Sequence, residues 1–399
     1  MKVHISMSHS LVGLFLVMTC LSCNMSKVWA TTQQLEGRQH QKRSDKPIVK
    51  SIKSPDGDII DCVHISHQPA FDHPLLENHT IQMRPSFYPL GLYDENNVES
   101  KMEPSSVPQL WHQKGRCPED TIPIRRTKKA ERYGKKRHRT IPNPTSAHPN
   151  QDDHRYEYAI IYTKGDVFYG AKGTINVWNP KVQEQDEYST SQIWVIGGPR
   201  EYLNAIEAGW HVMPSLYGDN KTRLFTFWTI DNSESIGCYN LLCSGFVQVN
   251  KEIALGATIY PISSYDGPQY AITLLIWQDP NTGNWWLQYG NRSPLGYWPS
   301  SLFSYLYDGA SEVQWGGKVL NLNVNGQHTS TEMGSGHFST DDARRASFIK
   351  NVQIVDRSNK LQTPPNGGEV MTQSACYDIL NTYRGVFYYG GPGKNPNCP

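Results

Sequence analysis

Residues 271–277 read Ala-Ile-Thr-Leu-Leu-Ile-Trp, an apolar run rich in β-branched and aromatic side chains that is typical of a buried strand. Similar runs recur after His154, and Gly, Pro, Asn and Asp separate them. They lie at Tyr156–Tyr162, Thr174–Trp178, Gln192–Ile196, Leu224–Thr229, Phe246–Val249, Trp285–Tyr289 and Val386–Tyr389. Long amphipathic helical patterns are missing from this part of the sequence. The pattern predicts an all-β fold with an antiparallel β-sandwich over residues 154–399.

The first 30 residues have the pattern of a signal peptide. Lys2 and His4 precede an apolar run from Leu11 to Leu21, and Val28-Trp29-Ala30 ends in the small residue that signal peptidase requires. The run is too short to span a bilayer, and no later stretch approaches the roughly 20 apolar residues that a spanning helix needs. We therefore expect an exported protein with no membrane contact after the signal is removed.

The cysteines suit an oxidising compartment, because an even set of six remains once Cys20 and Cys23 leave with the signal peptide. Their grouping favours disulfides between sequence neighbours: Cys62 with Cys117, Cys238 with Cys243, and Cys376 with Cys398. None has the paired CxxC spacing of a zinc site, so neither a metal nor a cofactor is predicted. Two triplets, beginning at Asn78 and Asn220, are glycosylation acceptors if they are exposed.

The residues before His154 divide into a small domain and a linker. Ile48–Ile52 and Ile59–Ile65 flank the turn signal Pro55-Asp56-Gly57-Asp58, which predicts a hairpin in a disulfide-stapled domain over residues 31–125. A basic run from Arg125 to Arg139 follows, with several prolines behind it. Such a run can bind nucleic acid, but in an exported chain we interpret residues 126–153 as an exposed processing linker and expect no nucleic-acid partner.

Two segments each place a chargeable side chain beside glycine and tryptophan in a strand-like run. The first is Ile206-Glu207-Ala208-Gly209-Trp210 and offers a carboxylate, and the second is Gln314-Trp315-Gly316-Gly317-Lys318 and offers an ammonium. Histidines 328 and 337 lie near Ser330 and Ser335, but no GxSxG or HExxH motif accompanies them, so we interpret them as polar supports. The pairs Trp285-Trp286 and Tyr297-Trp298 are typical of a sandwich core, although surface tryptophans keep carbohydrate binding as a rival function.

The chain resembles neprosin and its plant relatives, which are secreted glutamic peptidases with an N-terminal activation domain and a β-sandwich catalytic domain. The resemblance covers nearly the whole chain after the signal peptide. In the N-terminal part it rests on Asp61-Cys62-Val63, residues 68–76, Cys117-Pro118 and residues 122–126. In the C-terminal part it rests on residues 171–180, 191–194, 206–210, 237–239, 296–299, 333–338 and 389–392.

The resemblance implies a propeptide that inhibits the catalytic domain until acid releases it, and a proline-containing peptide or protein as substrate. It also implies an extracellular location, in the apoplast or cell wall, or a vacuolar one. The histidines of the N-terminal segment, His64, His67, His73 and His79, suggest how acid would act, since they gain charge near pH 6. Ordinary surface histidines are the alternative interpretation.

The family's chemistry uses two glutamates that share a proton, one acting as a base and the other as an acid. The resemblance places the first at Glu207, whereas the second position, after Trp-Gly-Gly, holds Lys318. Glutamate is also common before that motif, and here Gln314 stands there. In a regular strand, Glu312, Gln314 and Lys318 share one face, so Gln314 or Glu312 could approach Glu207. A bulge or a close backbone approach at Gly316-Gly317 is expected to break that arrangement.

Three functions therefore remain open from the sequence. One is a secreted, acid-acting endopeptidase that cleaves next to proline, with an incomplete dyad at Lys318. Another is a non-catalytic relative that binds proline-rich peptides or cell-wall polymers. The last is a secreted carbohydrate-binding sandwich.

Overall fold

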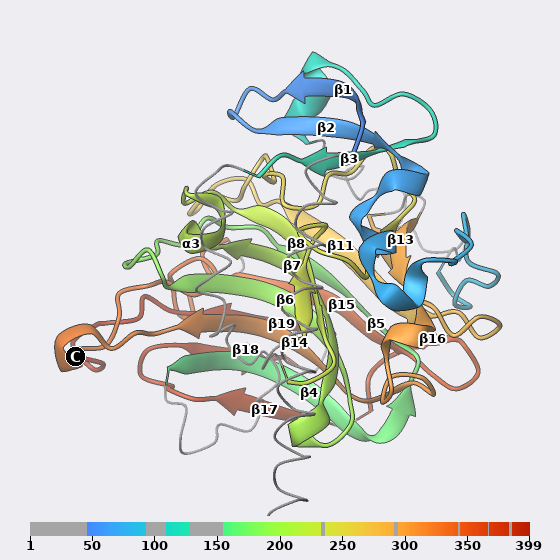
Figure 1. Ribbon diagram of the computed structural model, residues 1–399. Helices are drawn as coiled ribbons and strands as arrows, with labels where there is room; N and C mark the ends of the chain where they lie inside the picture. Colours follow the sequence, from blue (N-terminus) through green and yellow to red (C-terminus); the bar gives the residue numbers. More distant parts are fainter. Residues whose placement is uncertain are drawn as a thin grey trace, which may run out of the picture. The chain divides into compact units, whose positions relative to one another are not determined.

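The structure, a computed structural model, describes residues 46–92, 109–127, 155–232, 236–290, 294–341, 344–365, 367–382 and 385–399. The expected signal peptide and all but the first two residues of the expected linker lie outside the described residues. Ile48–Pro399 form one compact unit. Its described residues contain three antiparallel sheets, of three, seven and nine strands (Figure 1).

The seven-stranded sheet has the strand order β17-β4-β14-β6-β7-β8-β9, with every neighbouring pair antiparallel. All residues of the two central strands β6 and β7 are buried, so both faces of the sheet are covered there. The strands are β4 (Tyr156–Phe168), β6 (Tyr188–Gly197), β7 (Asn204–Val212), β8 (Arg223–Thr229), β9 (Gly237–Tyr239), β14 (Ala310–Leu320) and β17 (Gly368–Met371).

The nine-stranded sheet has the order β10-β13-β12-β11-β5-β15-β19-β18, and the short strand β16 pairs with β15. Its strands are β5 (Gly170–Asn176), β10 (Val247–Gln248), β11 (Ala271–Gln278), β12 (Trp285–Tyr289), β13 (Pro294–Trp298), β15 (Ser347–Val355), β16 (Leu361–Gln362), β18 (Asp378–Asn381) and β19 (Val386–Gly390). The helical elements of the described residues are short: the 3-10 helices η1 (Ile65–His67), η2 (Pro69–Asp72), η3 (Pro74–Leu76), η5 (Leu110–Lys114), η7 (Arg200–Tyr202), η8 (Ser300–Leu302) and η9 (Val324–Gly326), and the helix α3 (Pro214–Tyr217).

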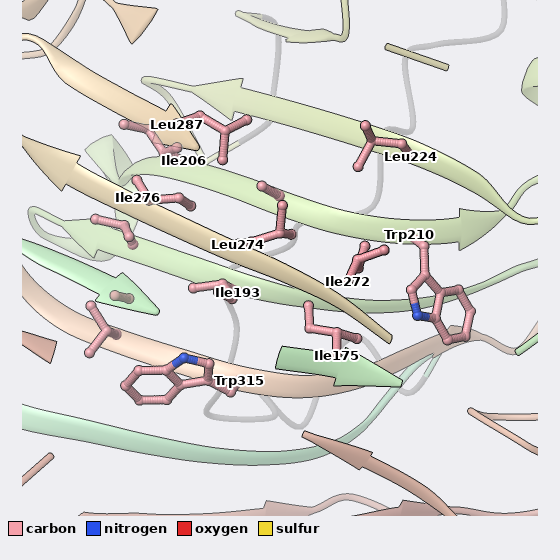
Figure 2. Packing of buried hydrophobic residues seen from close by; sticks show 14 of the residues in the cluster. Ile175, Ile193, Ile206, Trp210, Leu224, Ile272, Leu274, Ile276, Leu287 and Trp315 are labelled. Carbon is pink, nitrogen blue, oxygen red and sulfur yellow. The ribbon is translucent and has the colours of Figure 1, made fainter. Parts of the chain in front are cut away.

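The main core lies between the two large sheets (Figure 2). Ile206, Ala208 and Trp210 of β7 belong to it, and so do Ile272 and Ile276 of β11. Because successive residues of a strand point to opposite faces, Glu207 belongs to the face of the seven-stranded sheet that is turned away from this core. The antiparallel β-sandwich is thus confirmed, and its alternation decides where the Glu207 carboxyl points.

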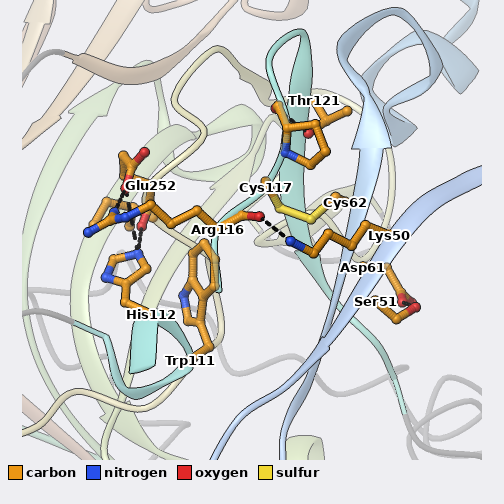
Figure 3. The surroundings of a disulfide bond; sticks show 12 residues. Lys50, Ser51, Asp61, Cys62, Trp111, His112, Arg116, Cys117, Thr121 and Glu252 are labelled. Atoms are coloured by element: carbon orange, nitrogen blue, oxygen red, sulfur yellow. Dashed lines mark hydrogen bonds and ion pairs between the residues drawn. A yellow bond between two sulfur atoms is a disulfide. The ribbon is translucent and has the colours of Figure 1, made fainter. Parts of the chain in front are cut away.

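The three-stranded sheet is formed by β1 (Ile48–Lys53), β2 (Ile59–His64) and β3 (Thr121–Arg125). The expected hairpin is present, and Gly57 has the positive φ of 91° that its turn requires. Strand β3 was not among the predicted strands, and the disulfide between Cys62 and Cys117 holds it close to β2 (Figure 3). One core cluster joins this disulfide and Trp111 to Ala254 and Ala257 of the sandwich. The N-terminal region is therefore packed against the sandwich.

The other two disulfides join Cys238 to Cys243 and Cys376 to Cys398, so all three join the pairs that the sequence favoured. Asn78 and Asn220 are both exposed, as a glycosylation acceptor must be. Among the described residues, no helix is long and apolar enough to cross a membrane.

Candidate functional site

Glu207 lies in the middle of β7 and is only 1% exposed. The register aligns it with Trp194 of β6 and Gln314 of β14 on one side, and with Phe227 of β8 on the other. Paired residues of antiparallel strands point to the same face. The carboxyl therefore stands among large side chains, away from bulk water.

Gln192 of β6 is the direct partner of Glu207, because its Nε2 donates a hydrogen bond to Oε2 of the carboxyl. In the register, Gln192 stands between Gly209 and Gly316. A Cβ atom at Gly209 would collide with the Gln192 side chain and the Ser191 carbonyl. Gly209 thus gives Gln192 the room to reach Glu207.

Lys318 lies on the same face, in the row that holds Thr190 of β6 and His211 of β7. Its side chain is buried, and its Nζ lies 5.5 Å from the ring centroid of Tyr188 and 6.0 Å from that of Trp194. These distances suit a cation–π contact. Within the described part of the chain, no hydrogen bond or ion pair joins the Lys318 ammonium to Glu207.

Of the two arrangements expected at Gly316-Gly317, the structure has the close approach and not the bulge, and the shared face is not broken. The register of β14 runs without a shift from Glu312 to Leu320 against both β4 and β6. The glycines serve close approach instead, since a Cβ at Gly316 would collide with the Ala159 carbonyl and one at Gly317 would crowd Met333. Glu312, Gln314 and Lys318 consequently share one face.

Gln314 and Glu312 are nevertheless bonded to each other, because Gln314 Nε2 donates to Glu312 Oε1 over 2.7 Å. Trp194 stands between Gln314 and Glu207 in the register. The observed Glu207 hydrogen bond comes from Gln192, a residue that sequence reasoning did not assign to the site. Gln192 lies in the Ser191-Gln192-Ile193-Trp194 block, which is part of the family resemblance, and this place in the sequence is the signal that could have identified it.

Burial and charge set the protonation of this site. Burial raises the pKa of Glu207 to about 7, although the Lys318 charge and the Gln192 hydrogen bond act in the opposite direction. Burial lowers the pKa of Lys318, and the nearby Glu207 opposes this change. The pKa of His211 lies well below its ordinary value because of burial and the charges of Arg223 and Lys318. In acid, the site therefore holds a neutral carboxyl beside an ammonium.

The other candidate groups form no catalytic set. His328 Nε2 contacts both carboxylate oxygens of Glu157, and Ser330 Oγ donates to Gln183. His337 pairs with Asp341 at 3.5 Å. His328 lies near Cys376 and Cys398, but these two sulfurs are joined in a disulfide and offer no thiolate to a metal.

Two family models match the chain: Neprosin over residues 185–392 and Neprosin activation peptide over residues 51–162. The chain belongs to the neprosin family. This membership supports a function of the peptidase type and, for the N-terminal region, the part of an inhibitory propeptide.

Solved structures of glutamic peptidases are also similar to this chain. The structure of scytalido-glutamic peptidase with a peptide-based transition state analog is 11% identical to this chain in sequence. The match covers 60% of this chain and 98% of that peptidase, with a TM-score of 0.33. A second structure of that peptidase, with a transition state analog inhibitor, has 11% identity, coverages of 59% and 97% and a TM-score of 0.34. A member of the Eqolisin family bound to a tripeptide has 10% identity, coverages of 59% and 96% and a TM-score of 0.31. Because these TM-scores are low, the assignment rests on the family models.

Proposed function

We propose that this protein is a non-catalytic member of its family that binds proline-containing peptides and does not hydrolyse them in acid. The observation that supports the absence of hydrolysis is the buried Lys318 ammonium on the face of Glu207. From the family resemblance we assign Lys318 to the position of the second glutamate. Hydrolysis by a carboxyl dyad needs one ionised and one protonated carboxyl. With the pKa of Glu207 at about 7, the single carboxyl is protonated in acid and cannot act as the base.

A peptide digest tests this proposal. We expect the processed protein to bind a proline-containing peptide at pH 2 to 6 without cleaving it above the uncatalysed rate, and its Glu207→Gln variant to behave in the same way. Mass spectrometry measures cleavage, and fluorescence anisotropy measures binding. Cleavage by the parent that disappears in the Glu207→Gln variant would establish a working enzyme despite Lys318. Affinity for polysaccharide without affinity for peptides would favour the carbohydrate-binding alternative.

We also propose that residues 31–125 are the propeptide of an exported, secreted or vacuolar protein, cut from the sandwich in the linker 126–153. Support comes from the hydrogen bonds across the boundary between the two regions. Gln68 donates from Nε2 to the Gln248 carbonyl at 3.1 Å and accepts from its backbone N–H at 2.7 Å. Gln109 makes the same paired contacts with Ala254, over 2.9 and 2.7 Å. The side-chain amides of Gln68 and Gln109 thus pair with the sandwich backbone as a neighbouring strand would.

Acid is expected to release this propeptide after the linker is cut. Burial lowers the pKa values of His73 and His79, so both are docked in the neutral form. A histidine with a lowered docked pKa contributes docking stability above its free value of about 6.5, and this contribution is lost as the pH falls below that value. Size-exclusion chromatography of the cut protein between pH 7 and pH 3 should show a docked fraction that falls at least about tenfold. The His79→Gln variant should respond less, and a fraction independent of pH would contradict the mechanism.

A further inference from the structure

Around β11, β12 and β13 the nine-stranded sheet carries apolar side chains on both faces, which is unusual for the outer face of a sandwich. Trp285, Leu287 and Trp298 point into the main core, whereas their neighbours Trp286 and Tyr297 belong to a separate cluster on the other face. The residues of that outer cluster are Ala70, Val247, Leu275, Trp277, Trp286, Tyr297, Val355 and Leu361. All are buried, so part of the chain covers this face.

Three rings cross this outer face as a continuous row, which we call the aromatic ladder: Trp277 of β11, Trp286 of β12 and Tyr297 of β13. The register places them directly opposite one another. The ring centroids of Trp277 and Trp286 are 6.3 Å apart and stacked, and those of Trp286 and Tyr297 are 4.7 Å apart. The ladder runs across the strands, so it offers an extended ligand a continuous row of rings.

The covering segment is residues 79–90 of the N-terminal region, and it contains Pro85 and Pro89. Tyr88 lies over Trp277 with 5.8 Å between ring centroids, and the Trp277 Nε1 donates to the Phe87 carbonyl over 3.1 Å. At the other end of the ladder, the Tyr297 hydroxyl accepts from the backbone N–H of Gln82 over 2.9 Å. The ladder therefore binds the segment through rings and through its backbone.

A buried carboxylate anchors the middle of the covering segment. Asp279 follows β11, is fully buried and accepts from the backbone N–H of Ser86 over 2.6 Å and from Gln82 Nε2 over 3.0 Å. The Ser86 hydroxyl also donates to it. Asn284 donates to the Gln82 side chain over 2.8 Å. A buried charge needs such partners, so Asp279 is built to hold an extended chain that presents N–H and O–H donors.

We propose that the aromatic ladder and Asp279 form a binding site for extended, proline-containing peptides, which residues 79–90 occupy in the full chain. Aromatic grooves with indole donors recognise such peptides because a proline-rich chain is already extended and leaves its carbonyls free. The indole N–H of Trp286 has no acceptor within the described residues and is a further donor for a ligand. This site lies on the other sheet from Glu207, and its opening rests on the propeptide release proposed above.

Binding of a labelled peptide with the sequence of residues 79–92 tests the proposal at pH 7. One protein is the unchanged full chain, and the other is a full-chain variant with Ser86→Ala and Tyr88→Ala, which weakens the covering segment. We expect at least tenfold tighter binding to the variant, because the intact segment competes at a high effective concentration. The same peptide with both substitutions should bind at least tenfold more weakly to the variant protein.

Further comparisons identify the site and the ligand class. In the variant protein, an added Asp279→Asn substitution should weaken binding about tenfold, and a scrambled peptide should bind no better than the substituted one. Equal binding by the two full-chain proteins, equal binding of the scrambled peptide, or displacement of the peptide by a plant-type oligosaccharide such as xylohexaose would each overturn the proposal. The readout is binding, so the result does not depend on whether the Glu207 site cleaves peptides.

Discussion

A Lys318→Glu variant is expected to cleave a proline-containing peptide at pH 3 to 5 at least about 1,000-fold faster than the parent protein. The substitution places a second carboxyl on the face of β14 that holds Lys318, in the same sheet as Glu207. Two carboxyls that share a site push their pKa values apart, so that one is ionised and the other protonated in acid. The variant thereby regains the base and the acid that peptide hydrolysis needs.

Two controls separate a restored dyad from a general loosening of the site. Lys318→Gln removes the ammonium without adding a carboxyl and should remain inactive. Adding Glu207→Gln to the Lys318→Glu variant should abolish the gained cleavage. A folded Lys318→Glu variant without activity would show that the two positions do not form a dyad. A parent that is already as active as the variant would show that Lys318 performs part of the chemistry, as an electrostatic oxyanion donor can.

Replacing Asp58 with alanine is expected to lower the free energy of unfolding by about 3–5 kcal/mol, because it removes the buried carboxylate that the buried Arg125 and Arg223 share. Asp58 lies in the turn between β1 and β2 and is 4% exposed at its side chain. It accepts from Arg125 Nε over 3.0 Å and from Arg223 Nη1 over 2.7 Å. The Arg223 side chain is 0% exposed and belongs to the sandwich, so Asp58 joins the two regions through charge.

Arg223 keeps Asp219 and the Gly256 carbonyl as partners in this variant, which sets the lower end of the expected loss. Chemical denaturation of the full chain measures the change. The matched control is Glu119→Ala, which breaks an exposed ion pair with Lys251 across the same boundary and should leave the midpoint close to that of the parent. Equal effects of the two substitutions would show that burial does not strengthen the Asp58 network.

The strand content of the sandwich could be predicted because β-branched and aromatic runs separated by turn residues are local signals. The faces of those strands were harder to assign. Trp285-Trp286 and Tyr297-Trp298 were expected in the core, yet each pair divides between the main core and the aromatic ladder. Alternation makes such a division unavoidable, but it does not say that a distant segment covers the outer face.

The candidate site was predictable at the positions that carry motifs and not at the contacts between them. Glu207 and Lys318 were found from the residues around them, whereas the hydrogen bond from Gln192 depends on the register of β6 against β7. Gly316 and Gly317 permit either a bulge or a close approach, and only the neighbouring Ala159 and Met333 decide for close approach. The sequence identifies the residue types of the site, but residues on neighbouring strands determine which contacts these residues make.

The sequence by itself determined the β-sandwich class, the place of Lys318 directly after a Trp-Gly-Gly motif, and the hairpin that carries Asp58. Each of these features depends on a local pattern of residues that are close together in the sequence. The tertiary structure alone decided that Glu207 and Lys318 are buried on one face, that Asp58 meets Arg223, and that residues 79–90 cover the aromatic ladder. These contacts join residues far apart in the chain, and their energies come from burial and charge pairing that exist only once the sheets are packed.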